Sequence, residues 1–193
     1  MPTGIGPAAA ARAADESLAR ASLATALIVG LSGALDPAYA LGDLLLLESV
    51  AAPGFPPRGL DANLVAALRR RLPAARTGVR GFSSERFVAK AAVKRRLRAA
   101  SGADALDMET YALVERLQGA GVRCAALRCV SDTAAGDVPD LTQAFRADGT
   151  LDRWRVGRAL LREPAAAWRL VRGGATALVQ LRGAMAALRS ASP

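Results

Sequence analysis

Two short segments of the sequence place acidic residues where an apolar run ends. In "ADALDMETYALVERL", Asp107 and Glu109 flank Met108 at the expected joint between a strand and a helix. A second apolar run, "CAALRCVSDTA", ends in Ser131 and Asp132. Carboxylates at such positions can stabilise a developing positive charge or take part in proton transfer. These two segments are therefore the first candidates for a functional site.

Each acidic residue also has a plainer interpretation. An acid in the first turn of a helix, such as Glu109, is favoured by the helix dipole. Asp132, directly after Ser131, could serve as a turn or N-cap residue. The nearby segment "GLSGAL" is a weak glycine-turn signal when it stands alone. The order and spacing of the three signals together carry more information than any one of them.

The composition limits which residue types can carry out acid-base chemistry or bind a metal. The 193 residues contain no histidine, which excludes histidine-based triads and histidine-ligated metals. Cys124 and Cys129 lie on one expected strand and should point to opposite faces, as reduced core residues rather than a disulfide or a metal pair. No metal site is predicted. Acid-base work must therefore fall to carboxylates, Lys, Tyr or Cys.

The charge and hydropathy patterns bear on location and partners. The sequence shows neither a signal peptide nor an apolar stretch long enough to span a membrane, so a cytoplasmic protein is expected. The net charge of +9 raises nucleic acid and anionic membranes as partners. With only 4 Phe, 2 Trp and 2 Tyr, the interleaved aromatic residues that base stacking requires are absent, so no nucleic-acid partner is expected.

Strands and helices are expected to alternate along the first 151 residues. Strands are expected at 26–29, after Gly42-Asp43, in "TGVRGF", and at 103–106 and 124–130. Helices are expected at 7–21, in "LDANLVAALRRRL", in the later part of "SERFVAKAAVKRRLRAAS", and at 109–118. A turn is expected at 30–33 and a loop at 53–59. The pattern predicts an α/β fold in three layers, with a mostly parallel or mixed central sheet flanked by helices and a site at the strand ends.

Residues 152–193 form an Arg-rich tail of the same domain, which otherwise spans 1–151. Eight Arg stand against Asp152 and Glu163, a local balance of +6. The apolar spacing is helical, with Pro164 and Gly173-Gly174 expected to divide the tail into two or three pieces. Such helices could cover the sheet with a solvated Arg face, or they could contact an anionic membrane surface. Peripheral contact with the inner membrane is therefore left open.

The ordered motifs resemble the superfamily of purine nucleoside phosphorylases and nucleosidases. The resemblance rests on "TGIGPAAAARAA", "GLSGALDPAYALGDLLL", "DMETYAL" and "LRCVSDTA", of which the Met-Glu and Ser-Asp pairs are the specific part. Within the superfamily, "FRADGTLDRWRVGRALLREPAAAWRLVRGG" is similar to the hopanoid-biosynthesis-associated phosphorylases, whose expected substrate is adenosylhopane.

The resemblance implies cleavage of the N-glycosidic bond of a purine nucleoside. Glu109 would bind the ribose hydroxyls and Asp132 would assist departure of the purine at N7. The latter role needs a proton on Asp132, which burial would favour. No cofactor is implied beyond inorganic phosphate as a co-substrate, and relatives suggest a homo-oligomer. The substrate-binding residues implied by the resemblance are Met108, Phe87, Val88, Ser32, Gly33 and Ser131.

The resemblance also leaves one part of the pattern unmatched. The first residues of the chain resemble a later part of the family's pattern. The family's opening strand, which carries a residue that serves water or phosphate, therefore has no counterpart in this sequence. No motif assigns Arg58, Arg80 or Arg86 to phosphate. We therefore expect either a start-site truncation of an active enzyme or a shortened relative that binds nucleosides without cleaving them.

Overall fold

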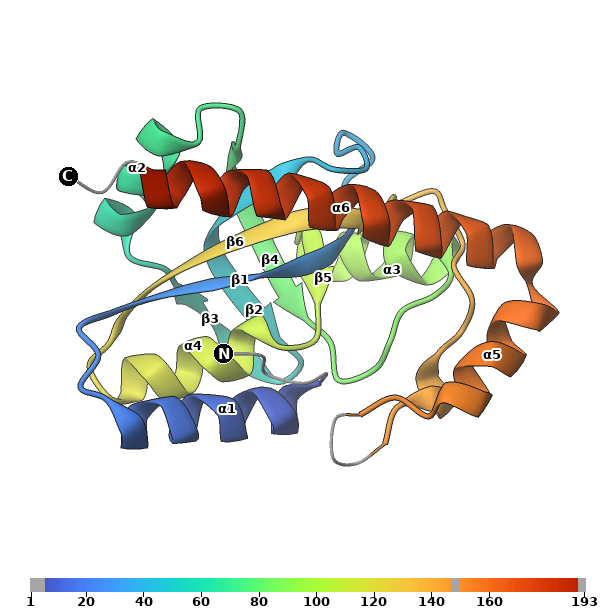
Figure 1. The fold of residues 1–193 in the computed structure, drawn as a ribbon, viewed down its shortest axis with the longest axis horizontal. Helices are drawn as coiled ribbons and strands as arrows, with labels where there is room; N and C mark the ends of the chain where they lie inside the picture. Colours follow the sequence, from blue (N-terminus) through green and yellow to red (C-terminus); the bar gives the residue numbers. More distant parts are fainter. Residues whose placement is uncertain (1–5, 147–149, 191–193) are drawn as a thin grey trace.

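A six-stranded sheet in the order β3-β2-β4-β5-β1-β6 forms the centre of the fold (Figure 1). The computed structural model describes residues 6–146 and 150–190. The strands are β1 (Thr25–Ala34), β2 (Leu44–Ala52), β3 (Phe55–Gly59), β4 (Arg76–Ser83), β5 (Ala105–Asp107) and β6 (Arg123–Asp132). The helices are α1 (Pro7–Arg20), α2 (Ala62–Arg71), α3 (Ala91–Ser101), α4 (Thr110–Gly119), α5 (Arg153–Arg162) and α6 (Pro164–Ser190), with a 3₁₀ turn at Thr142–Ala144.

The sheet is mixed and it closes on itself. β2, β4 and β5 run parallel to one another, and β1 and β6 run the other way. The first residues of β2, Leu44 to Leu46, pair with β6, while its later residues pair with β3. The expected α/β fold with a mixed sheet flanked by helices is confirmed.

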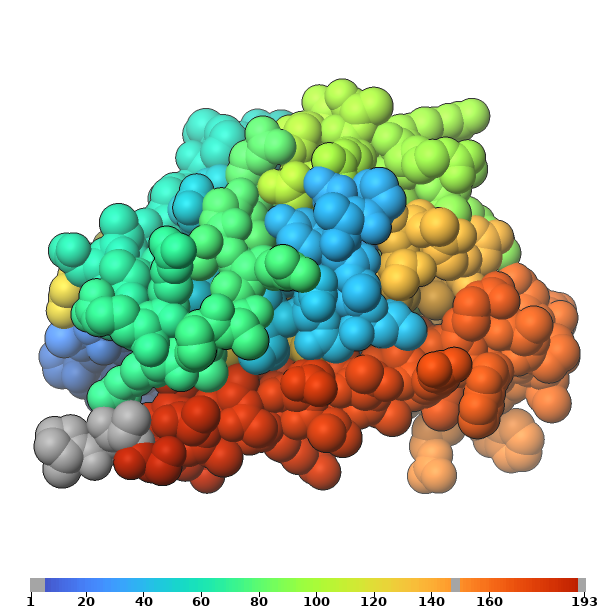
Figure 2. Space-filling model, turned by 90° about the horizontal axis from the view of Figure 1, so that it is seen from above, coloured from blue at the N-terminus to red at the C-terminus, as the bar shows by residue number. Residues whose placement is uncertain are grey.

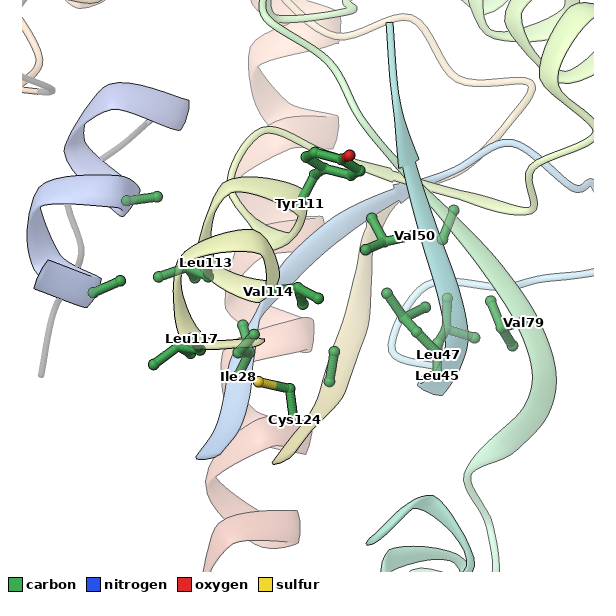
Figure 3. Close-up of a cluster of buried hydrophobic side chains, with 14 of the residues drawn as sticks. Ile28, Leu45, Leu47, Val50, Val79, Tyr111, Leu113, Val114, Leu117 and Cys124 are labelled. Atoms are coloured by element: carbon green, nitrogen blue, oxygen red, sulfur yellow. The ribbon is translucent and has the colours of Figure 1, made fainter. Parts of the chain in front are cut away.

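Strand β6 is buried on both faces because a hydrophobic cluster lies on each side of it. Cys124 and Val130 belong to a cluster that also contains side chains of α1, α4 and β2. Figure 3 shows Cys124 on the side of β6 that faces α4. Leu127 and Cys129 pack with α2 and α6 on the opposite side. Both cysteines are free and buried, and burial raises the pKa of each thiol to about 11. The prediction that they point to opposite faces is confirmed.

The expected turn at 30–33 is wrong, because β1 continues as a strand to Ala34. Its residues pair in parallel with β6 from Thr25 to Gly33, with one irregularity between Ser32 and Gly33. The glycines in this segment therefore do not turn the chain. They provide space for side chains of the neighbouring strand, as the site geometry shows below.

The expected loop at 53–59 is also partly wrong. After a turn around Gly54, the chain forms β3, which pairs antiparallel with β2. β3 lies at the edge of the sheet, and an edge strand tolerates prolines such as Pro56 and Pro57 because one side needs no backbone donors.

The Arg-rich tail forms two helices and not three. Asp152 accepts hydrogen bonds from the backbone N–H groups of Trp154 and Arg155 and so caps α5, and Pro164 begins α6. α6 then continues through Gly173 without a break, packing across β6 (Figure 1). A Cβ at Gly173 would lie 1.8 Å from the carbonyl oxygen of Ser131. This glycine therefore permits close packing of the helix on the strand, and packing outweighs its low helix propensity.

Candidate functional site

One pocket of about 670 Å³ collects the residues that the sequence singled out. Its size is in the range of small-molecule sites, and apolar side chains dominate its walls. The predicted site residues that line it are Ser32, Gly33, Phe87, Val88, Met108, Glu109, Ser131 and Asp132. The structure thus brings together all eight positions, while their individual roles stay predictions.

Asp107 organises the start of α4. Its carboxylate accepts hydrogen bonds from the backbone N–H groups of Glu109 and Thr110, both at 3.1 Å, and from the Ser83 hydroxyl at 2.6 Å. Asp107 therefore caps the helix with its side chain, whereas Glu109, at the N-cap position itself, makes no side-chain cap. Asp107 is therefore a structural residue. Because it caps the helix, the Glu109 carboxylate remains available to the pocket.

Arg128 supports this corner of the pocket from β6. Its Nε lies 3.0 Å from an Asp107 carboxylate oxygen, and both side chains are only 4% exposed. The guanidinium also donates to the Thr110 hydroxyl. A Cβ at Gly30 would lie 1.9 Å from Arg128 Nη1, so the glycine on the neighbouring strand makes room for the guanidinium. Sequence reasoning missed Arg128, although an arginine inside an apolar strand was a readable signal.

Glu109 presents a largely buried carboxylate to the pocket. One oxygen accepts the Gly6 N–H at 2.7 Å, and the other accepts the Met108 N–H at 3.3 Å. Burial is the main cause that raises the pKa of Glu109 above its ordinary value of 4.5. The Gly6 hydrogen bond opposes that rise in pKa, the Asp107 charge adds to it, and Arg128 opposes it more weakly. Two N–H contacts leave further acceptor positions on the carboxylate for a ligand.

Asp132 forms an ion pair with Lys94 of α3. The Lys94 side chain is fully buried, and its ammonium group contacts Asp132 Oδ2 and donates to the Thr133 carbonyl at 2.8 Å. The other Asp132 oxygen accepts the Ser131 hydroxyl at 3.0 Å. A Cβ at Gly33 would lie 2.8 Å from Asp132 Oδ2, so this glycine also provides space for a carboxylate.

The structure places the buried Lys94 ammonium group directly against Asp132. The expected proton on Asp132 stays a prediction. Lys94 was missed in the sequence because it belongs to a helix with five charged or polar positions, where one buried lysine has no distinguishing pattern. Its role follows from the approach of α3 to the end of β6.

Aromatic and hydroxyl groups complete the pocket. The Phe87 ring stacks at a tilt on Phe145, with ring centroids 5.9 Å apart, and both residues line the pocket. Ser131 donates to the Ser32 carbonyl at 3.2 Å. The Ser32 hydroxyl is buried without a hydrogen-bond partner within the part of the chain that the structure describes. A bound polar molecule could satisfy it.

The three arginines considered for phosphate separate in the structure. Arg86 lines the pocket. Arg58 lies 3.2 Å from Glu115, and Arg80 lies 3.3 Å from Asp104, both away from the pocket lining. Among residues 6–146 and 150–190, no group of three or more Asp, Glu or Cys could hold a metal ion. No helix in those ranges is long and apolar enough to cross a membrane.

A comparison with known protein families identifies the family of this chain. The model of the phosphorylase superfamily matches residues 2–162. The chain belongs to the phosphorylase superfamily. The matched range includes every pocket residue that the sequence analysis had singled out, and it ends within the Arg-rich tail. No curated protein matches the chain significantly in sequence.

Solved structures show the same fold at low sequence identity. A 5′-methylthioadenosine/S-adenosylhomocysteine nucleosidase of Helicobacter pylori superposes with a TM-score of 0.68 and 18% identity, covering 95% of this chain and 77% of that one. The futalosine hydrolase of the same organism gives 0.68 and 16%, covering 95% and 76%. The Campylobacter jejuni nucleosidase gives 0.63 and 21%, covering 83% and 74%. The specific member with a hopanoid role is not distinguished by these matches.

Proposed function

We propose that this superfamily member cleaves the N-glycosidic bond of a purine nucleoside. The observation that carries the proposal is the placement of two carboxylates, Glu109 and Asp132, in the wall of one pocket with Phe87. Cleavage creates positive charge on the ribose and negative charge on the departing base. The pocket offers a carboxylate for the ribose, a carboxyl group through which a proton can reach the base, and an aromatic ring for the purine.

Glu109 would act on the ribose. When ionised, its free acceptor positions can bind the 2′- and 3′-hydroxyls, and its charge can stabilise the cationic sugar as the bond breaks. Met108, which precedes it, lines the same wall and would pack against the ribose. The Gly6 N–H and the neighbouring Asp107–Arg128 pair hold this carboxylate in position.

Asp132 would act on the base at N7. The proton that reaches N7 would come from the Lys94 ammonium group by way of the Asp132 carboxyl group, leaving Lys94 neutral. Ser131 would orient the second carboxylate oxygen through its 3.0 Å hydrogen bond. Assistance of this type accelerates a reaction roughly 10²–10⁴-fold.

The finer assignments belong to the same proposal. The pocket extends beyond the carboxylates to Leu27, Ile28 and Leu117, an apolar extension that would accept a large apolar 5′ group such as that of adenosylhopane. Water and phosphate are both candidate acceptors, and Arg86 is the pocket arginine available to phosphate. We also propose a homo-oligomer and cytoplasmic action with peripheral membrane contact.

Release of free adenine tests the reaction directly. Purified protein is incubated with adenosine, methylthioadenosine or adenosylhopane, with and without phosphate, and adenine is quantified by chromatography. We expect Glu109→Gln and Asp132→Asn each to lower the rate by roughly 10²-fold or more. The exposed Glu85, outside the pocket, supplies the matched control Glu85→Gln. Equal rates in all four proteins would contradict the assignment of these carboxylates.

A second candidate is a relative that binds nucleosides without cleaving them. The Lys94–Asp132 ion pair favours it, because Lys94 and Ser131 already engage both oxygens of the Asp132 carboxylate. Calorimetry separates the two functions. Micromolar binding of adenosine with no adenine released at any pH would support the binding function and overturn the catalytic one.

A further inference from the structure

The two tail helices present large apolar side chains to solvent. Trp154 is 90% exposed and Leu161 84% on α5, and Trp168 is 65% exposed near the start of α6. Farther along α6, Val171, Leu178 and Val179 are 56%, 48% and 64% exposed, and exposed arginines lie between and beyond them. We call this the tail surface, and its apolar members are Trp154, Leu161, Trp168, Val171, Leu178 and Val179.

The tail surface is separate from the face that α6 uses for packing. The packing face consists of Ala166, Gly173, Ala177, Leu181 and Ala184, which are buried against the sheet. At about 100° per residue, Trp168 lies on the opposite side of the helix, and Val171 and Leu178 lie on its flank, outside the packing face. Figure 2 shows α6 running along one side of the molecule with its outer surface uncovered. The apolar residues of the tail surface are therefore not part of the core.

Positive charge surrounds these apolar side chains. α5 and α6 contain eight arginines, all exposed, and no acidic residue. The two acids near them, Asp152 and Glu163, lie at the helix ends. Arg155 and Arg169 donate hydrogen bonds to the backbone carbonyls of Gln143 and Asp137. Arg153, Arg158, Arg162, Arg172, Arg182 and Arg189 make no side-chain hydrogen bond or ion pair within the described residues.

The combination of positive charge and exposed apolar side chains favours one class of partner over two others. A second copy of the chain docking through the same face would bring the arginines of both copies together, which like-charge repulsion opposes. A nucleic acid would use the arginines but would leave Leu161 and Val171 exposed. A bilayer interface accepts both, because the apolar residues enter the acyl boundary while the arginines remain at anionic headgroups.

We propose that the tail surface docks on an anionic phospholipid bilayer, with Trp154, Leu161, Trp168 and Val171 inserted at the interface. α5 and α6 would lie along the membrane rather than cross it. The rest of the molecule would be held so that the side of the pocket formed by Leu170 of α6 and by Leu151, just before the tail, lies close to the headgroups. The inference concerns a surface and does not depend on which reaction the pocket performs.

Tryptophan emission gives a direct readout, because the sequence contains 2 Trp and both belong to the tail surface. The full chain is titrated with vesicles of phosphatidylcholine alone or with phosphatidylglycerol added, and co-sedimentation is measured in parallel. We expect a blue shift and sedimentation with phosphatidylglycerol vesicles, and neither with phosphatidylcholine alone. Raising the salt concentration should weaken the binding because it screens the arginines.

Matched variants test whether the tail surface itself, and not the net positive charge of the protein, causes the binding to vesicles. Arg158→Gln with Arg172→Gln removes two tail arginines, and Arg95→Gln with Arg96→Gln removes two exposed arginines of α3. We expect the tail pair to weaken binding about 25-fold, at about fivefold per arginine, and the α3 pair to leave it nearly unchanged. Val171→Ser, on a residue 56% exposed, should weaken binding roughly three- to tenfold, whereas Val93→Ser, 47% exposed on α3, should not.

Several outcomes would overturn the proposal. One is an equal loss of binding in the tail and α3 arginine variants, which would indicate non-specific attraction of a basic protein. Another is a blue shift that depends on protein concentration without vesicles, with a dimer in sedimentation velocity, which would assign the surface to a second copy. A third is binding to a single-stranded oligonucleotide that Val171→Ser leaves intact, together with no binding to vesicles.

Discussion

Lys94 and Asp132 form an ion pair in which the lysine side chain is fully buried and the aspartate side chain is 14% exposed. The pair joins α3 to the end of β6. The lysine also donates to the Thr133 carbonyl at 2.8 Å, so it holds the chain that follows β6. One buried cation therefore fixes both a candidate catalytic carboxylate and the loop beside it.

Replacing Lys94 by methionine should destabilise the fold strongly. The substitution removes one partner of a buried pair and leaves the Asp132 charge uncompensated, a change that costs roughly 3–5 kcal/mol. Urea unfolding measures this loss. The double variant Lys94→Met with Asp132→Asn removes both charges and should recover part of the stability. A double variant as unstable as the sum of the two singles would show that the pair is not coupled.

Two adjacent glycines should respond to alanine in opposite directions. At Gly173 a Cβ would lie 1.8 Å from the Ser131 carbonyl oxygen, whereas at Gly174 nothing lies within 4 Å. We expect Gly173→Ala to cost roughly 1–3 kcal/mol through overpacking. Gly174→Ala should instead stabilise α6 by roughly 0.5–1 kcal/mol, because alanine has the higher helix propensity. Thermal unfolding of the two variants provides the test, and a shift of the same sign in both would contradict it.

The Arg128–Asp107 pair should matter far more than a surface pair. Arg128→Met leaves Asp107 buried without its cation and should cost roughly 3–5 kcal/mol. The control is Arg20→Met on α1, where Arg20 and Glu16 are 72% and 55% exposed and lie 3.7 Å apart. That loss should stay below about 1 kcal/mol. Urea unfolding compares the two, and similar losses would show that the Asp107 hydrogen bonds suffice without Arg128.

The titration of Glu109 should make stability depend on pH. Burial raises its pKa in the folded chain, so protonation stabilises the fold. That contribution is complete below the ordinary value of 4.5 and is lost as the pH rises through the raised pKa. We therefore expect the free energy of unfolding of the natural chain, relative to Glu109→Gln, to fall over this window. Urea unfolding at several pH values measures the difference, and a relative rise would contradict the prediction.

The sequence by itself determined the elements that carry the site. The apolar run of β6 is buried on both faces because its side chains alternate between two cores, a pattern visible in the residues alone. Helix α4 and the strand before it follow from local periodicity, and Asp107 and Glu109 fall at their joint. Local preference and patterning are properties of neighbouring residues, so they can be read without a fold.

The tertiary structure decided how the site residues are held. Gly30, Gly33 and Gly173 had the local signature of turns or helix ends, yet each lies within a regular element. Their function is to make space for Arg128, for Asp132 and for the backbone at Ser131. That function depends on which side chain or carbonyl approaches from a distant segment, and no local pattern encodes such an approach. The burial of Lys94 against Asp132 has the same origin, because only the packing of α3 on the end of β6 brings the two charges together.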